Sequence, residues 1–169
     1  MIRFLFIDTS TNPVNDYTSL EEISAALYGL RTFLNDGDAT FKSITQAEAM
    51  VAVKARKNNI LVVLPCGGGK TAVYAVPIML EQGLVSVLVV PLVALQSDLC
   101  RRLEEASIRY EIYHVGRMQG GTMPDTKIIV VPVENAVTPP FIELCQRLVE
   151  QNKLARVVSL IYIFELYSI

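Results

Sequence analysis

Three consecutive glycines followed by lysine and threonine, in the stretch LPCGGGKT at residues 64–71, constrain this chain more than any other feature. Glycine loses more backbone freedom on folding than any other residue, so a run of three is unfavourable inside a helix or a strand. The run follows the apolar residues 60–63, which predict a buried strand that ends at Leu64. We therefore expect a tight turn between a strand and a helix at this place.

A glycine-rich turn that opens a helix is suited to binding phosphate. Its successive backbone N–H groups can form a concave anion site at the positive end of the helix dipole. Lys70 would then reach the β and γ phosphates of a nucleotide, and the Thr71 hydroxyl would coordinate Mg²⁺. The stretch departs from the general G-x-x-x-x-G-K-[ST] pattern at Leu64, and a chance Lys-Thr after a glycine turn is the alternative. The predicted nucleotide contacts are Pro65, Cys66, Gly67, Gly68, Gly69, Lys70 and Thr71.

Predicted helices and short apolar strands alternate along the chain. Ser19 and Glu22 form a capping box before apolar residues at helical spacing, which predicts a helix that ends near residues 35–37. Further helices are expected at 45–57, 70–82, 94–106 and 140–152, and strands at 60–64, 85–90, 111–115 and 127–131. Continuously apolar strands that alternate with helices predict an α/β fold with a parallel sheet covered on both faces.

Composition and charge exclude several classes of protein. With 169 residues and 51% hydrophobic content, the chain suits one domain with a sizeable core. A net charge of −2 gives no global reason to expect nucleic acid, and three widely spaced cysteines with one histidine favour neither a disulfide framework nor a zinc site. The apolar segment at residues 4–7 is too short for a signal peptide, and residues 84–95 are too short and interrupted for a membrane helix. We expect a soluble protein that does not bind membranes.

The loop in the form apolar-Pro-x-Gly-Gly-Gly-Lys-Thr resembles motif I of the superfamily 2 helicases, and most closely that of the RecQ-like DNA helicases. Upstream, FKSITQAEA at residues 41–49 is similar to the aromatic-and-glutamine motif of the same family. The resemblance implies that Phe41 and Gln46 belong to the nucleotide site, with Gln46 bonded to the adenine edge. A carboxamide can pair with both N7 and N6 of adenine, which suits it to selecting ATP over GTP. An ordinary solvated glutamine is the alternative.

Two downstream segments are similar to elements that contact DNA in RecQ-like helicases. The first, VVPLVALQSD at residues 89–98, resembles motif Ia, in which N–H groups at a helix start hold DNA phosphates without reading sequence. The second, residues 128–137, resembles a strand followed by a Thr-Pro-Glu turn, but Pro132 replaces the threonine and Val133 the proline, so the hydroxyl contact is absent. For the first segment, an ordinary strand-to-helix connection is the alternative. The implied DNA contacts are Pro91, Leu92, Ala94, Leu95 and Glu134.

The resemblance extends from Phe41 to Val158, where the family continues into an Asp-Glu-x-His box. The next residues here are SLIYIFELYSI, which lack that box. In the family the aspartate holds Mg²⁺ and the glutamate activates water, and Glu165 is not expected to replace them. We therefore expect a flanking helical region at residues 1–40, a partial RecA-like P-loop NTPase lobe at 41–158 and a divergent tail at 159–169. The chain is expected to be the truncated front end of a longer helicase.

The resemblance implies the ATP-binding and nucleic-acid-binding lobe of an ATP-dependent DNA helicase. Its cofactors would be ATP and Mg²⁺, its partner single-stranded or duplex DNA, and its location the nucleus, although no targeting signal is visible and the cytoplasm is otherwise expected. A stand-alone P-loop nucleotide-binding module is the alternative. A GTPase is not expected, because Asn152-Lys153 lacks the following x-Asp that reads guanine.

Overall fold

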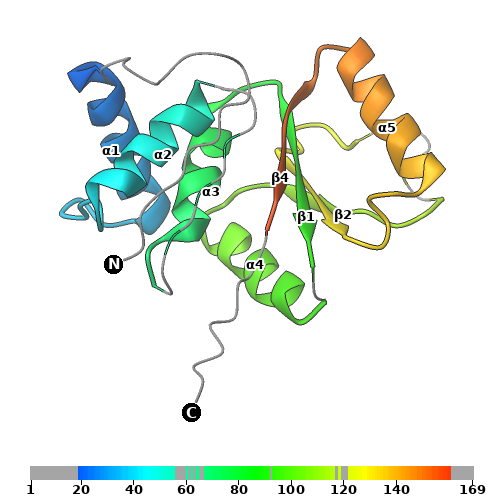
Figure 1. The fold of residues 1–169 in the computed structure, drawn as a ribbon, viewed down its shortest axis with the longest axis horizontal. Coiled ribbons are helices and arrows are strands. Elements are labelled where there is room, and N and C mark those ends of the chain that lie inside the picture. Colours follow the sequence, from blue (N-terminus) through cyan, green and yellow to red (C-terminus); the bar gives the residue numbers. More distant parts are fainter. Residues whose placement is uncertain are drawn as a thin grey trace. The chain divides into compact units, whose positions relative to one another are not determined.

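A computed structural model describes residues 19–55, 60, 62, 64, 67–91, 93–116, 118 and 122–160. The chain divides into two compact units, Met1–Gln82 and Gly83–Ile169. Among the described residues, the first unit consists of helices, and the second holds a parallel sheet with two helices (Figure 1). The chain therefore has the α/β fold that its sequence predicts.

The first helix, α1 (Leu20–Leu34), begins and ends where the sequence predicts. The Ser19 hydroxyl accepts a hydrogen bond from the Glu22 N–H at 3.1 Å, and the Glu22 carboxylate accepts one from the Ser19 N–H at 2.9 Å. At the other end, Asn35 takes the left-handed conformation, with φ of 50°. Both ends thus satisfy backbone groups that a helix leaves without intrahelical partners.

Helices α1, α2 (Ile44–Lys54) and α3 (Lys70–Leu80) pack against one another in the first unit (Figure 1). Their contact depends on Gly29 of α1, because a Cβ atom there would lie only 2.6 Å from Cγ1 of Val76 in α3. The absent side chain lets the two helix backbones approach closely. The buried core of this unit contains Ala26, Leu30, Ala49, Met50, Val51, Leu64, Ala72, Val73 and Val76.

The second unit is built on a sheet of strands in the order β2-β3-β1-β4, all of them parallel. These strands are β1 (Val85–Val90), β2 (Tyr110–Ile112), β3 (Ile128–Pro132) and β4 (Leu154–Ser159). In the register, Val87 lies opposite Ile129 on one side and Val157 on the other. The connections contain α4 (Val93–Glu105) and α5 (Pro139–Glu150).

Both faces of the two central strands are buried, which explains their continuously apolar sequence. Side chains at alternating positions of β1, including Val87 and Val89, pack with Phe141 and Leu144 of α5. The intervening positions, such as Leu88, point to the opposite face, and Leu88 is fully buried as well. The two central strands are therefore covered on both sides, as the sequence predicts.

The helices predicted after residue 40 begin at or one residue before their expected starts and end one to three residues earlier. Strand β1 agrees with its prediction, whereas β2 is shorter than expected and ends at Ile112. The strand predicted at 60–64 is not present among its described members, Ile60, Val62 and Leu64. Leu64 instead belongs to the core of the helical unit, with Val62 packed against it. The other two members of the predicted strand, Leu61 and Val63, lie outside the described residues.

No helix in the described part of the chain combines the length and the apolar character needed to span a membrane.

Candidate functional site

The glycine-rich loop has the backbone shape that only glycine adopts without strain. Gly67 and Gly69 both lie in the left-handed region, with φ of 74° and 77°, and Gly68 between them does not have a positive φ. Such alternation turns successive N–H groups toward one concave side, which is the geometry of an anion-binding nest. Gly69 is also the N-cap of α3, so the loop ends at the positive pole of a helix.

The side chains that would meet a bound anion follow directly in the first turn of α3. Lys70 is its first residue and Thr71 its second, and both are partly exposed. Gly67 is exposed, and no atom would lie within 4 Å of a Cβ placed on it. Lys70 and Thr71 therefore follow the glycine loop directly and are accessible at the start of α3.

Gln46 lies against this loop and is 2% exposed. Its Oε1 accepts a hydrogen bond from the Lys42 N–H at 2.8 Å, and its Nε2 donates to the Gly69 carbonyl at 3.4 Å. The Ser43 hydroxyl, which caps α2, accepts from the Gln46 N–H at 3.1 Å. The glutamine is therefore not an ordinary solvated residue, since it joins the start of α2 to the start of α3.

Lys42 makes a second link between the same two segments. Its Nζ donates to the Gly67 carbonyl at 2.7 Å. Phe41, beside it, is partly buried and packs against the helical core. Sequence reasoning missed Lys42, because a single exposed lysine between an aromatic residue and a helix cap has no periodic signature.

The residues predicted to contact DNA come partly together at one end of the sheet. Pro91 follows β1, and Glu134 follows β3 in an exposed turn. These two strands are paired neighbours, with Val90 opposite Pro132, so their carboxyl ends lie at the same edge. Ala94 and Leu95 belong to the first turn of α4.

Three predicted site residues lie outside the described residues: Pro65 and Cys66 of the nucleotide site, and Leu92 of the DNA contacts.

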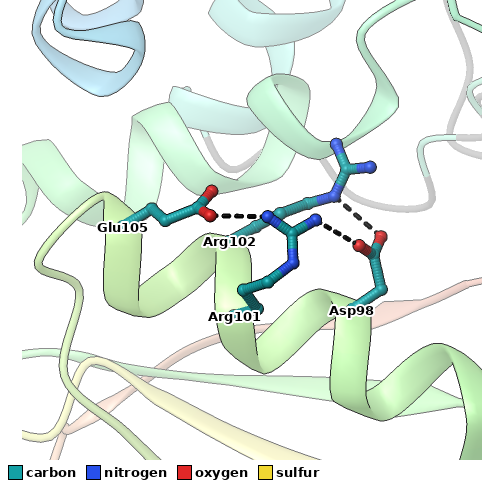
Figure 2. A network of polar contacts seen from close by, with 4 residues as sticks. All are labelled: Asp98, Arg101, Arg102 and Glu105. Atoms are coloured by element: carbon teal, nitrogen blue, oxygen red, sulfur yellow. Dashed lines mark hydrogen bonds and ion pairs between the residues drawn. The ribbon is translucent and has the colours of Figure 1, made fainter.

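The adjacent arginines of α4 are occupied by ion pairs within their own helix (Figure 2). Asp98 binds Nη2 of Arg101 at 2.6 Å and Nε of Arg102 at 2.8 Å, while Nη1 of Arg101 binds Glu105 at 2.5 Å. Hydrogen bonds from Arg101 and then Arg102 hold the pKa of the Asp98 carboxyl below its usual value. The arginine pair is thus a solvated, largely neutralised helix face.

A polar contact joins the end of α4 to β2. The Tyr110 hydroxyl donates to Glu104 at 2.6 Å, and this bond raises the pKa of the tyrosine. Burial raises the pKa of the Cys100 thiol nearby and that of Cys145 in α5. These groups stay protonated at neutral pH, so none of them is an activated nucleophile.

Within the described ranges, no three His, Cys, Asp or Glu side chains form a metal-binding group.

The chain is similar to known proteins over most of its length. A family model described as DEAD/DEAH box helicase matches residues 43–159. ATP-dependent DNA helicase RecQ of Bacillus subtilis strain 168 is 25% identical over 136 residues, which are 75% of this chain and 21% of that protein. ATP-dependent DNA helicase Q5 of Mus musculus is 27% identical over 132 residues, which are 72% of this chain and 13% of that protein. The chain thus spans about a fifth or less of the length of the curated relatives it matches.

Proposed function

The chain belongs to the DEAD/DEAH box helicase family, and we propose that its residues 41–158 are the ATP-binding lobe of a RecQ-like DNA helicase. The observation that carries the proposal is the loop at the start of α3, where two left-handed glycines precede Lys70 and Thr71. The similarity to two helicases named RecQ and Q5 supports the assignment to the RecQ-like helicases within that family.

In this proposal the loop binds the triphosphate of ATP. The backbone N–H groups of the loop face the phosphate oxygens, and the Lys70 ammonium neutralises charge on the β and γ phosphates. The Thr71 hydroxyl would hold Mg²⁺, which supplies further positive charge beside the phosphates when it is bound. The partial exposure of Lys70 and Thr71 leaves both side chains within reach of a ligand.

We further propose that Gln46 selects adenine, with Phe41 beside the base. The Gln46 carboxamide makes one bond through its oxygen and one through its nitrogen inside the protein. A carboxamide oxygen has two lone pairs and its nitrogen has two hydrogens, so one acceptor and one donor remain for adenine. The two internal bonds of Gln46 fix the direction of its carboxamide. Because the side chain is 2% exposed, a base reaches it only when the groups that cover it move.

For DNA, we propose that phosphates bind backbone N–H groups in the segment of Pro91, Leu92, Ala94 and Leu95 and near Glu134. Pro91 itself has no N–H, and the Glu134 carboxylate only accepts hydrogen bonds. The carboxyl ends of β1 and β3 bring Pro91 and Glu134 to one edge, next to the N–H groups that open α4. Because Asp98 already pairs with both neighbouring arginines, they add little positive charge to this surface. The proposed binding is therefore weak and independent of sequence.

The sequence of 169 residues contains no adjacent Asp-Glu pair. In RecQ-like helicases, the aspartate of such a pair holds Mg²⁺ and its glutamate activates water. We therefore propose that this chain by itself binds ATP without hydrolysing it at the rate of a helicase. A purified chain whose ATP turnover rises on adding DNA would contradict this part of the proposal.

Titration with a fluorescent ATP analogue tests the nucleotide site. Lys70→Ala should weaken binding by about tenfold or more, because it removes a charge-assisted contact to phosphate. Lys54→Ala is the matched control, since Lys54 is an exposed lysine in the last turn of α2. Equal affinities of the wild-type chain and the Lys70 variant would refute the assignment.

A further inference from the structure

Lys42 contacts the glycine loop from a position 25 residues away in the sequence. Its Nζ lies 2.7 Å from the Gly67 carbonyl oxygen, and its own N–H donates to Oε1 of Gln46 at 2.8 Å. The side chain therefore starts from an anchored backbone and ends on the loop. Gln46, one helical turn further on, holds the Gly69 carbonyl through Nε2.

The contact with Lys42 bears on the direction of one backbone N–H group, and the contact with Gln46 adds to the Ala72 N–H, 3.1 Å from the Gly69 carbonyl, in directing another. In a planar trans peptide, the carbonyl of one residue and the N–H of the next point in opposite directions. Drawing the Gly67 carbonyl toward Lys42 turns the Gly68 N–H away from it. In the same way, drawing the Gly69 carbonyl toward Gln46 turns the Lys70 N–H away. Both N–H groups then face the side of the loop opposite residues 42–46.

We propose that Lys42 is a positioning residue of the phosphate loop, which holds the Gly67 carbonyl and thereby directs the Gly68 N–H toward bound phosphate. This inference rests on the proposed function, because it assigns Lys42 a role in the same nucleotide site. The bond from the Lys42 N–H to Oε1 of Gln46 also fixes which end of the glutamine carboxamide faces Gly69. Lys42 therefore acts on both contacts to the loop, its own with Gly67 and that of Gln46 with Gly69.

An exposed lysine contributes little to overall stability, but the bond here acts on a loop of glycines, which have the most backbone freedom to lose. Without Lys42, the Gly67–Gly68 peptide can rotate, and part of the loop's order must then be gained during binding. The loss of affinity should therefore affect every ligand whose phosphates bind the loop, whether or not the ligand has a base or a γ phosphate.

Binding of ATP, ADP and inorganic tripolyphosphate to Lys42→Ala, Lys42→Arg and the Lys54→Ala control tests the proposal. Lys42→Ala should weaken all three ligands by the same factor, about threefold to tenfold, the effect of one lost hydrogen bond. Lys42→Arg, which keeps a cationic donor, should bind within about twofold of the wild type. A loss for ATP and tripolyphosphate that spares ADP would overturn the proposal, because Lys42 would then contact the terminal phosphate directly. A loss for ATP and ADP that spares tripolyphosphate would also overturn it, because Lys42 would then contact the base.

A second measurement needs no nucleotide. The amide resonance of Gly68 in a ¹⁵N–¹H correlation spectrum reports the hydrogen bond to the preceding carbonyl, so Lys42→Ala should shift it and Lys54→Ala should not. An unmoved Gly68 resonance would overturn the proposed contact. If the wild-type chain bound none of the three ligands, the proposed function would fail, and the Gly68 resonance would still decide whether Lys42 holds the loop.

Discussion

The side chain of Gln46 occupies the space that a side chain on Gly69 would need. Nε2 of Gln46 donates to the Gly69 carbonyl at 3.4 Å, and a Cβ built on Gly69 would overlap that nitrogen. Gly69 therefore has two reasons to be glycine, its φ of 77° and this contact. A glutamine in the first turn of α2 and the N-cap glycine of α3, 23 positions apart, are in direct steric contact.

Gly69→Ala should lower the free energy of unfolding by about 2–3 kcal/mol, because it combines a strained left-handed conformation with a steric overlap. It should also weaken ATP binding, since relieving the overlap displaces either the loop or Gln46. Urea denaturation and ATP titration measure both effects.

Gly67→Ala is the matched control for that substitution. It introduces the same kind of strain, at φ of 74°, with no atom within 4 Å of the new Cβ, so its cost should be closer to about 1 kcal/mol. Gly37→Ala, where nothing lies within 4 Å and φ is not positive, should be nearly neutral. Equal destabilisation by all three would show that the contact with Gln46 has no energetic role.

Gln46→Ala should reduce the preference for ATP over GTP and should also weaken both nucleotides. The first effect follows from the proposed adenine contact, and the second from loss of the bond to the Gly69 carbonyl. A common loss of about threefold to tenfold corresponds to one hydrogen bond. Competition titrations with ATP and GTP give both numbers, and an unchanged ATP-to-GTP ratio would remove Gln46 from the base site.

Asp98 should titrate below its ordinary pKa of 3.8, because Arg101 and Arg102 stabilise its charged form. A carboxyl with a lowered pKa in the folded state contributes stability above its unfolded pKa, and this contribution disappears as the pH falls through the folded pKa. The stabilisation should therefore be complete above about pH 4, and the ion pairs should break only as the pH falls below 3.8, through the lowered pKa. Carboxyl ¹³C titration measures the midpoint, and Arg101→Gln should move it toward 3.8; a wild-type midpoint at or above that value would contradict the paired geometry.

Binding to single-stranded DNA should be weak and should decrease steeply with salt. The proposed contacts address phosphates, whose binding releases counterions, and the chain carries a net charge of −2. Fluorescence anisotropy at two salt concentrations measures the dependence. Asp98→Asn should strengthen binding at low salt, since it releases Arg101 and Arg102 from their shared partner. Tight binding that ignores salt would be incompatible with phosphate contacts.

Local signals predicted most elements because their causes lie within a few residues. The capping box of Ser19 and Glu22 fixes the start of α1, and the left-handed Asn35 fixes its end. Strand β1 was also predictable, since a strand buried on both faces leaves a continuous apolar run. Within residues 60–64, the described members Ile60, Val62 and Leu64 join no strand, and Leu64 is buried in the core of the helical unit.

The sequence by itself determined the alternation of helices and strands and the glycine-lysine-threonine loop at the start of α3, because turns, caps and apolar periodicity act over short distances. Only the tertiary structure decided the strand order β2-β3-β1-β4, the pairing of Gln46 with Gly69 and that of Lys42 with Gly67. A hydrogen bond between residues more than twenty positions apart depends on how helices pack, and no periodic pattern in either segment records its partner. The chemistry of the loop could therefore be predicted from its residues, whereas the side chains that hold the loop in shape became visible only in the folded chain.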